Sequence, residues 1–173
     1  ISRMEEIEKS DIFLSVIELN KGIIYKVVNS YCKNMEDRKD LVQEIIIQLW
    51  KSFDDYDKNF KYSTWMYRIS LNVAISFYRK ENSRKRISTP FTEGIIHFTH
   101  NDSLEDKESN LGILQHMILE LKDLDKALML LYLEEKSHKE ISQIIGISET
   151  NVATKISRIK NILQRKFTQL KNQ

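Results

Sequence analysis

Aromatic, cationic and amide side chains follow one another between residues 53 and 80, a mixture that suits contact with a nucleic-acid strand. Aromatic rings stack on unpaired bases, at about 1–3 kcal/mol per base, and cations neutralise the phosphates. The loop rings are Phe53, Tyr56, Phe60 and Tyr62, and the helix band after them holds Trp65, Arg68, Asn72 and Arg79. The alternative is that these rings only close a core. We favour that alternative for Tyr62, whereas the two interpretations of Trp65 have equal support.

A second group of polar side chains lies among helix-capping signals. Ser137 and Glu140 fit a capping box at the start of a short helix. Gly146 can end that helix in the left-handed conformation, and Ser148 can cap the next one. This order predicts a helix-turn-helix.

In the second helix of this motif, the spacing of apolar and polar residues predicts one apolar and one polar face. The apolar stripe is formed by Val152, Ile156, Ile159 and Leu163. The polar side of the helix carries Thr150, Thr154, Ser157 and Asn161, with Asn151 and Arg158 on its shoulder. Small polar and cationic groups on a helix suit hydrogen bonding in a DNA major groove. A plain helical hairpin with a solvated face remains the alternative.

A third surface is predicted on the helix that spans residues 36–52. Asp40, Gln43, Glu44 and Ile47 recur at helical spacing on one face, opposite an apolar one. An isoleucine among acidic and amide groups favours docking to another protein, but single exposed isoleucines are common, so both interpretations stay open.

These groups require helices to position them, and the composition agrees. Four glycines and one proline in 173 residues are too few for the turns of a sandwich, a barrel or a glycine-rich nucleotide fold. We therefore predict an all-α chain of two small domains, 5–86 and 111–173, joined by a flexible linker at 87–110. The expected helices cover residues 12–31 (with a possible break at Asn20 or Gly22), 36–52, 64–83, 111–121, 123–135, 138–145 and 149–170, with a loop at 53–63.

The charges are uneven although the net charge is only +2. Residues 61–86 hold seven Lys and Arg against one Glu, and residues 138–173 hold seven against two acidic residues. The segment 87–112 between them carries five acidic residues against one Lys. Two basic segments favour two nucleic-acid contacts on one chain.

Several classes of protein are disfavoured by what the sequence lacks. The four histidines are scattered and no nucleophile–base motif occurs, so we expect no enzyme, no metal, no cofactor and no small-molecule substrate. No apolar run reaches the length of about 20 residues that a membrane span needs. The N-terminus lacks the pattern of a secretion signal and the single cysteine cannot form an intrachain disulfide, so we expect a cytoplasmic protein.

At the level of whole motifs, the chain resembles extracytoplasmic-function (ECF) sigma factors of bacterial RNA polymerase. The first half is similar to their conserved region 2 at residues 40–44, at Phe60, at residues 64–69, at Asn72 and at Arg79-Lys80. The second half is similar to their region 4 at residues 131–134, 145–148 and 155–158.

The resemblance implies a role for each surface. It implies that Asp40, Gln43, Glu44 and Ile47 dock on the clamp coiled coil of core RNA polymerase. It implies that −10 promoter DNA is opened and held by Tyr56, Phe60, Trp65, Arg68, Asn72, Arg79 and Lys80. It implies that the helix starting at Ser148 enters the −35 major groove, with contacts from Ser148, Thr150, Asn151, Thr154, Lys155 and Arg158. An anti-sigma factor is a further partner that it implies.

One departure from the family pattern bears on the −35 expectation, and two other functions are alternatives to this one. Lys155 stands where relatives usually carry Arg, and Lys binds guanine less rigidly, so the −35 sequence is left open. The alternative function is a stand-alone helix-turn-helix repressor or activator, which would leave the stripe around Asp40 and the loop rings unexplained. An adaptor that binds only proteins is disfavoured by the two basic segments.

Overall fold

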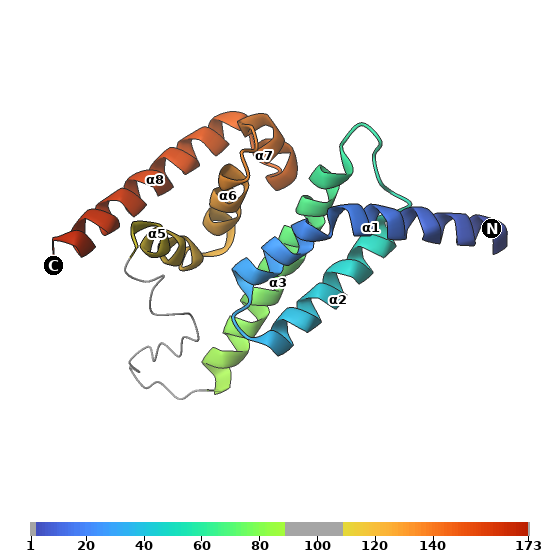
Figure 1. Cartoon of the computed structure of the whole chain (residues 1–173), viewed down its shortest axis with the longest axis horizontal. Helices are drawn as coiled ribbons and strands as arrows, with labels where there is room; N and C mark the ends of the chain where they lie inside the picture. The colour runs from blue at the N-terminus through green and yellow to red at the C-terminus, as the bar shows by residue number, and fades with distance from the viewer. Residues whose placement is uncertain (1–2, 89–108, 173) are drawn as a thin grey trace. The chain divides into compact units, whose positions relative to one another are not determined.

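The computed structural model describes residues 3–88 and 109–172, and all regular structure within those ranges is α-helical (Figure 1). The helices are α1 (Arg3–Tyr31), α2 (Met35–Ser52), α3 (Tyr62–Ser88), α5 (Asn110–Leu119), α6 (Asp123–Leu133), α7 (His138–Ile145) and α8 (Glu149–Lys171). This confirms the predicted all-α class. Most of the expected linker lies outside the described residues.

Internal contacts divide the chain into two compact units. The first consists of Ile1–Tyr78 with Gln143–Ile145, and the second of Arg79–Ser142 with Gly146–Gln173. The domain bounds 5–86 and 111–173 remain a prediction.

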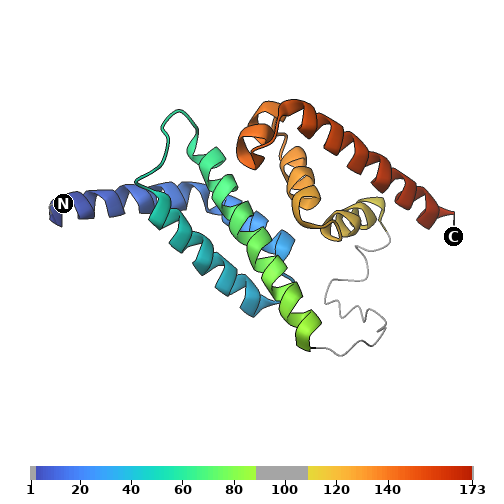
Figure 2. The same cartoon turned by 180° about the vertical axis from the view of Figure 1, so that it is seen from behind.

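The first three helices form a bundle around one apolar core. In both views α2 and α3 run antiparallel, joined by residues 53–61, and α1 crosses them (Figures 1 and 2). The core includes fully buried Leu41, Ile45 and Leu49 of α2 and Met66 and Leu71 of α3. Burial of this kind supplies most of the free energy that holds short helices in place.

Helix α1 continues through the position where the sequence suggested a break. The amide of Asn20 donates to the Val16 carbonyl oxygen at 2.9 Å, and Gly22 lies exposed with no heavy atom near its missing Cβ. A glycine in a helix costs only about 1 kcal/mol relative to alanine. The apolar residues on either side, Val16 and Ile24 among them, are buried and outweigh that cost.

The last four helices contain the predicted helix-turn-helix with its expected caps. The Ser137 hydroxyl accepts from the Glu140 amide at 3.1 Å, and the Glu140 carboxylate accepts from the Ser137 amide at 3.0 Å. Gly146 ends α7 with φ +82°, and the Ser148 hydroxyl accepts from the Asn151 amide at the start of α8. The buried residues of α8 are those of the predicted stripe, Val152, Ile156, Ile159 and Leu163.

Candidate nucleic-acid and protein interfaces

The α2 stripe, defined as Asp40, Gln43, Glu44 and Ile47, lies on the surface as predicted. All four side chains are exposed, because the opposite face of α2 is buried in the bundle core. The Gln48 amide donates to the Glu44 carboxylate at 2.9 Å and orients it. The stripe therefore offers two carboxylates, an amide and one apolar group on a rigid helix.

Ile47 also borders an apolar groove between α1 and α2. The groove has a volume of about 350 Å³ and is lined by Ser10, Phe13, Leu14, Ile46, Ile47, Trp50 and Lys51. Ile47 is 46% exposed and Leu14 is 59% exposed, so this apolar surface is continuous with the α2 stripe. Exposed apolar surface beside acidic groups is suited to a protein partner.

The aromatic loop, residues 53–61, is held by its own turns and by neighbouring rings. Backbone bonds run from the Tyr56 amide to the Phe53 carbonyl and from the Phe60 amide to the Asp57 carbonyl. The Tyr56 ring stacks on Tyr62 with centroids 4.4 Å apart and meets Trp65 edge-on at 5.4 Å. The loop is thus an ordered cluster in which Tyr56 and Phe60 stay partly exposed.

The phenol of Tyr56 anchors the loop across its turn. Its hydroxyl donates to the carbonyl oxygen of Phe60, four residues on. Burial raises the pKa of Tyr56 above its usual value of 10.0, and the neighbouring Tyr62 and Asp57 raise it further.

Trp65 occupies a position beneath the loop. It is only 9% exposed and contacts Phe53, Tyr56 and Tyr62. Of the two interpretations that the sequence left equal, this placement supports the core role, because so little of the ring is accessible to a base. Tyr62, for which the core role was favoured, is half-buried in the same cluster.

The α3 band, defined as Arg68, Asn72, Arg79 and Lys80, lies exposed along the helix that follows the loop. At 100° per residue, Arg68, Asn72 and Arg79 fall within a narrow sector of one face. The side chains opposite them, including Met66 and Ser70, are buried. The structure therefore places Asn72 two turns beyond Trp65 on an accessible, cationic face.

The α8 face, defined as Ser148, Thr150, Asn151, Thr154, Lys155 and Arg158, occupies the first turns of α8. All six residues are exposed except Lys155, which is half-buried. The Thr154 hydroxyl donates to the Thr150 carbonyl at 2.9 Å. The same turns bury Val152 and Ile156, which fix the orientation of the face within the helix-turn-helix.

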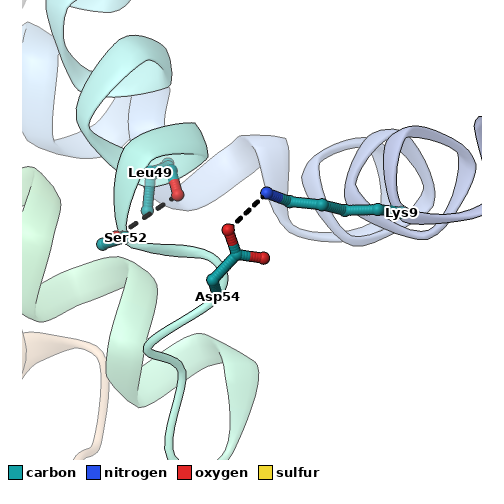
Figure 3. A network of polar contacts seen from close by, with 4 residues as sticks. All are labelled: Lys9, Leu49, Ser52 and Asp54. Carbon is teal, nitrogen blue, oxygen red and sulfur yellow. Dashed lines mark hydrogen bonds and ion pairs between the residues drawn. The ribbon is translucent and has the colours of Figure 1, made fainter. Parts of the chain in front are cut away.

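Two residues that sequence patterns did not single out support the aromatic loop. Lys9 of α1 forms an ion pair with Asp54, with 2.6 Å between Nζ and Oδ2 (Figure 3). Phe13, one turn further along α1, meets Phe53 edge-on at 5.3 Å. Their helical spacing of four was visible in the sequence, but their partners lie about 40 residues away and no local pattern identifies them.

Over residues 3–88 and 109–172, no group of three or more His, Cys, Asp or Glu side chains is placed to hold a metal ion. No helix in that part of the chain has the length and apolar character to cross a membrane.

Comparison with protein families gives two matches, one in each half of the chain. Residues 16–84 match the model of Sigma-70 region 2, and residues 111–163 match that of Sigma-70 region 4. Together the two matches span more than half of the chain. They contain the α2 stripe, the aromatic loop, the α3 band and the α8 face.

Similar proteins support both matches over nearly the full length. The ECF RNA polymerase sigma factor SigW of Bacillus subtilis is 29% identical, with 97% of this chain and 96% of that protein covered. SigM of the same species is 26% identical, with 86% and 91% covered.

Two solved structures share the fold. CnrH in complex with the cytosolic domain of CnrY gives a TM-score of 0.63 at 16% identity, covering 92% of this chain and 89% of that one. The sigma factor RpoE in complex with the anti-sigma factor NepR from Bartonella quintana gives 0.64 at 19% identity, covering 90% and 95%.

Proposed function

The chain belongs to the sigma-70 family as a sigma factor of the ECF type, which directs RNA polymerase to promoters, and we propose a division of this task among its four surfaces. The observation that carries the proposal is the exposure of the α2 stripe, the α3 band and the α8 face on helices whose opposite faces form the cores, together with the partly exposed rings of the aromatic loop.

The α2 stripe is the docking site for core RNA polymerase. Its carboxylates, with Gln48 holding that of Glu44, can pair with cationic groups of the clamp coiled coil, and Ile47 adds an apolar contact. Truncation of charged residues at an interface typically lowers affinity strongly when the pair is desolvated.

The aromatic loop and the α3 band hold the melted −10 strand. Tyr56, Phe60 and Asn72 form the pocket for a base removed from the duplex, and Arg68, Arg79 and Lys80 neutralise the phosphates. Unstacking a base costs a few kcal/mol, and selective binding of the open strand shifts the equilibrium toward the bubble. Trp65 supports the loop from below rather than lying against the DNA, in keeping with its burial.

The α8 face reads the −35 duplex. Its hydroxyl, amide and cationic groups lie on the second helix of a helix-turn-helix, the element that enters the major groove in this motif. Lys155 and Arg158 contribute phosphate or base contacts. Because the polymerase holds both DNA-binding surfaces, each can bind weakly alone and still act at high effective concentration.

The remaining partners follow from the same role. The protein performs no covalent chemistry and acts in the cytoplasm, where the polymerase is. An anti-sigma factor is a regulator of this chain, a proposal supported by the structural similarity to a sigma factor solved with the anti-sigma factor NepR.

A reconstitution experiment tests the central assignment. Purified protein with bacterial core polymerase should give run-off transcripts from its promoter, and Asp40→Ala with Glu44→Ala should lower core affinity at least tenfold without changing the circular dichroism spectrum. The control is Glu6→Ala with Glu8→Ala, which removes two exposed carboxylates from α1.

Two results would contradict this proposal. Binding of promoter duplex without any effect on polymerase would identify the stand-alone repressor or activator instead. Equal core affinity of the Asp40/Glu44 and Glu6/Glu8 variants would remove the α2 stripe from the polymerase interface.

A further inference from the structure

A charged side chain of α1 contacts the first residues of the aromatic loop. Figure 3 shows the Lys9 side chain extending from α1 toward the Asp54 carboxylate, which lies just after the end of α2. The Nζ–Oδ2 distance is 2.6 Å, and Nζ also lies 4.6 Å from the ring centroid of Trp50. One lysine thus contacts both the last turn of α2 and the second residue of the loop.

Aromatic contacts continue this connection from α1 into the aromatic loop. Phe13 meets Trp50 at 5.0 Å and Phe53 at 5.3 Å, both edge-on. Phe53 in turn lies 5.9 Å from Trp65, which contacts Tyr56. The path from α1 to the ring proposed to hold a flipped base is therefore continuous.

Only the lysine of this ion pair is partly shielded from solvent. The Lys9 side chain is 28% exposed, and that of Asp54 is 70% exposed. Asp54 is not buried, so the pair adds little to the core. Its effect is to restrict where the loop begins, and the Ser52 hydroxyl helps by donating to the Leu49 carbonyl at 3.3 Å.

We propose that Lys9 is a positioning residue for −10 recognition, which orders the aromatic loop through Asp54 and Trp50 before DNA binds. The inference rests on the proposed function of that loop. A loop held in its binding conformation loses less conformational entropy when a base enters it. Lys9 and Phe13 precede residue 16, where the Sigma-70 region 2 match begins, so this support comes from outside the matched segment.

The chain provides a matched control in a second ion pair on α1. Lys21 pairs with Glu18 at the same distance, 2.6 Å, but both residues belong to α1 and the pair does not reach the loop. Lys9→Met and Lys21→Met each remove one positive charge from one helix. Any general weakening of attraction to DNA will therefore appear equally in both variants.

The first measurement uses the free, full-length protein. Limited trypsin digestion should cut after Lys58 and Lys61, both exposed in the loop, two to five times faster in Lys9→Met than in wild type or Lys21→Met. A two- to fivefold change corresponds to about 0.4–1 kcal/mol, which lies within the range that exposed ion pairs contribute. Hydrogen exchange of residues 53–61 should rise by the same factor.

The second measurement follows promoter opening with core polymerase. Lys9→Met should form open complexes two to five times more slowly than Lys21→Met, with equal affinity for core polymerase. Lys9→Arg keeps the charge and should restore the rate. Raising the salt concentration should shrink the difference between the two lysine variants, because salt screens exposed pairs.

Asp54→Asn separates positioning from bulk electrostatics. It removes a negative charge, so a nonspecific effect would speed DNA binding, whereas loss of the ion pair should slow opening as Lys9→Met does. Provided that wild type initiates, the inference is overturned if Lys9→Met and Lys21→Met show equal loop digestion and equal opening rates. If wild type itself fails to initiate, the proposed function fails, and the digestion result still decides whether Lys9 orders the loop.

Discussion

Replacing Gly146 by alanine tests whether the turn between α7 and α8 depends on a left-handed residue. Gly146 has φ +82° and ψ 30°, and its amide donates to the Ser142 carbonyl at 2.8 Å. A Cβ built on Gly146 would meet no heavy atom within 4 Å. The whole cost of Gly146→Ala must therefore arise from backbone conformation rather than from collision.

The expected magnitude follows from that geometry. The left-handed conformation costs an L-residue about 1–2 kcal/mol, and the lower entropy of the unfolded alanine chain offsets about 0.4–1 kcal/mol. The net loss should be about 1 kcal/mol, or a factor of about five in the opening equilibrium. Gly22→Ala is the matched control, because Gly22 also has open space around it but lies within helix α1.

The two substitutions should have opposite signs. Gly22→Ala should stabilise α1 by about 0.8–1.0 kcal/mol, the difference in helix propensity. Hydrogen exchange with mass spectrometry resolves both effects in the full chain. Protection of α7 and α8 peptides should fall about fivefold in Gly146→Ala, and protection of α1 peptides should rise in Gly22→Ala. Unchanged or increased protection of α7 and α8 in Gly146→Ala would refute the argument from backbone conformation.

Two further substitutions test the DNA-binding surfaces. Asn72→Ala should slow open-complex formation about tenfold or more, because a hydrogen bond to a base is lost. Affinity for core polymerase, measured by fluorescence anisotropy, should stay unchanged. An equal loss of opening rate and core affinity would contradict the assignment of Asn72 to the base pocket. Arg158→Ala should weaken −35 binding by the holoenzyme and lower the slope of log affinity against log salt by about one, as expected for one lost phosphate contact. A smaller affinity with an unaltered slope would assign Arg158 to base edges instead.

The helix-turn-helix could be predicted nearly residue by residue because its signals are local. Ser137, Glu140, Gly146 and Ser148 each act on a backbone group within four residues, and the structure contains each of these caps. The α2 stripe was predictable for a related reason. Residues three or four positions apart share one face of a helix, and the apolar residues between them form the opposite, buried face.

Other features depend on contacts distant in sequence and were not predictable in that way. The possible break at Asn20 or Gly22 does not occur, because burial of residues on both sides outweighs a small local penalty. The sequence left the role of Trp65 undecided, because its burial depends on rings that fold over it from the loop. Lys9 could be placed on a helix but not paired with Asp54, which is 45 residues away.

The hydroxyl groups at the start of α8 have complementary polarity. Thr154 uses its hydrogen on the Thr150 carbonyl, so its oxygen is left with lone pairs and can only accept. The Ser148 oxygen already accepts from the Asn151 amide, so its hydrogen remains available to donate. Two chemically similar side chains on one helix end are thereby made unlike. In the proposed −35 contact, Thr154 would then suit the amino groups of adenine and cytosine, and Ser148 would suit the O6 and N7 of guanine or a phosphate.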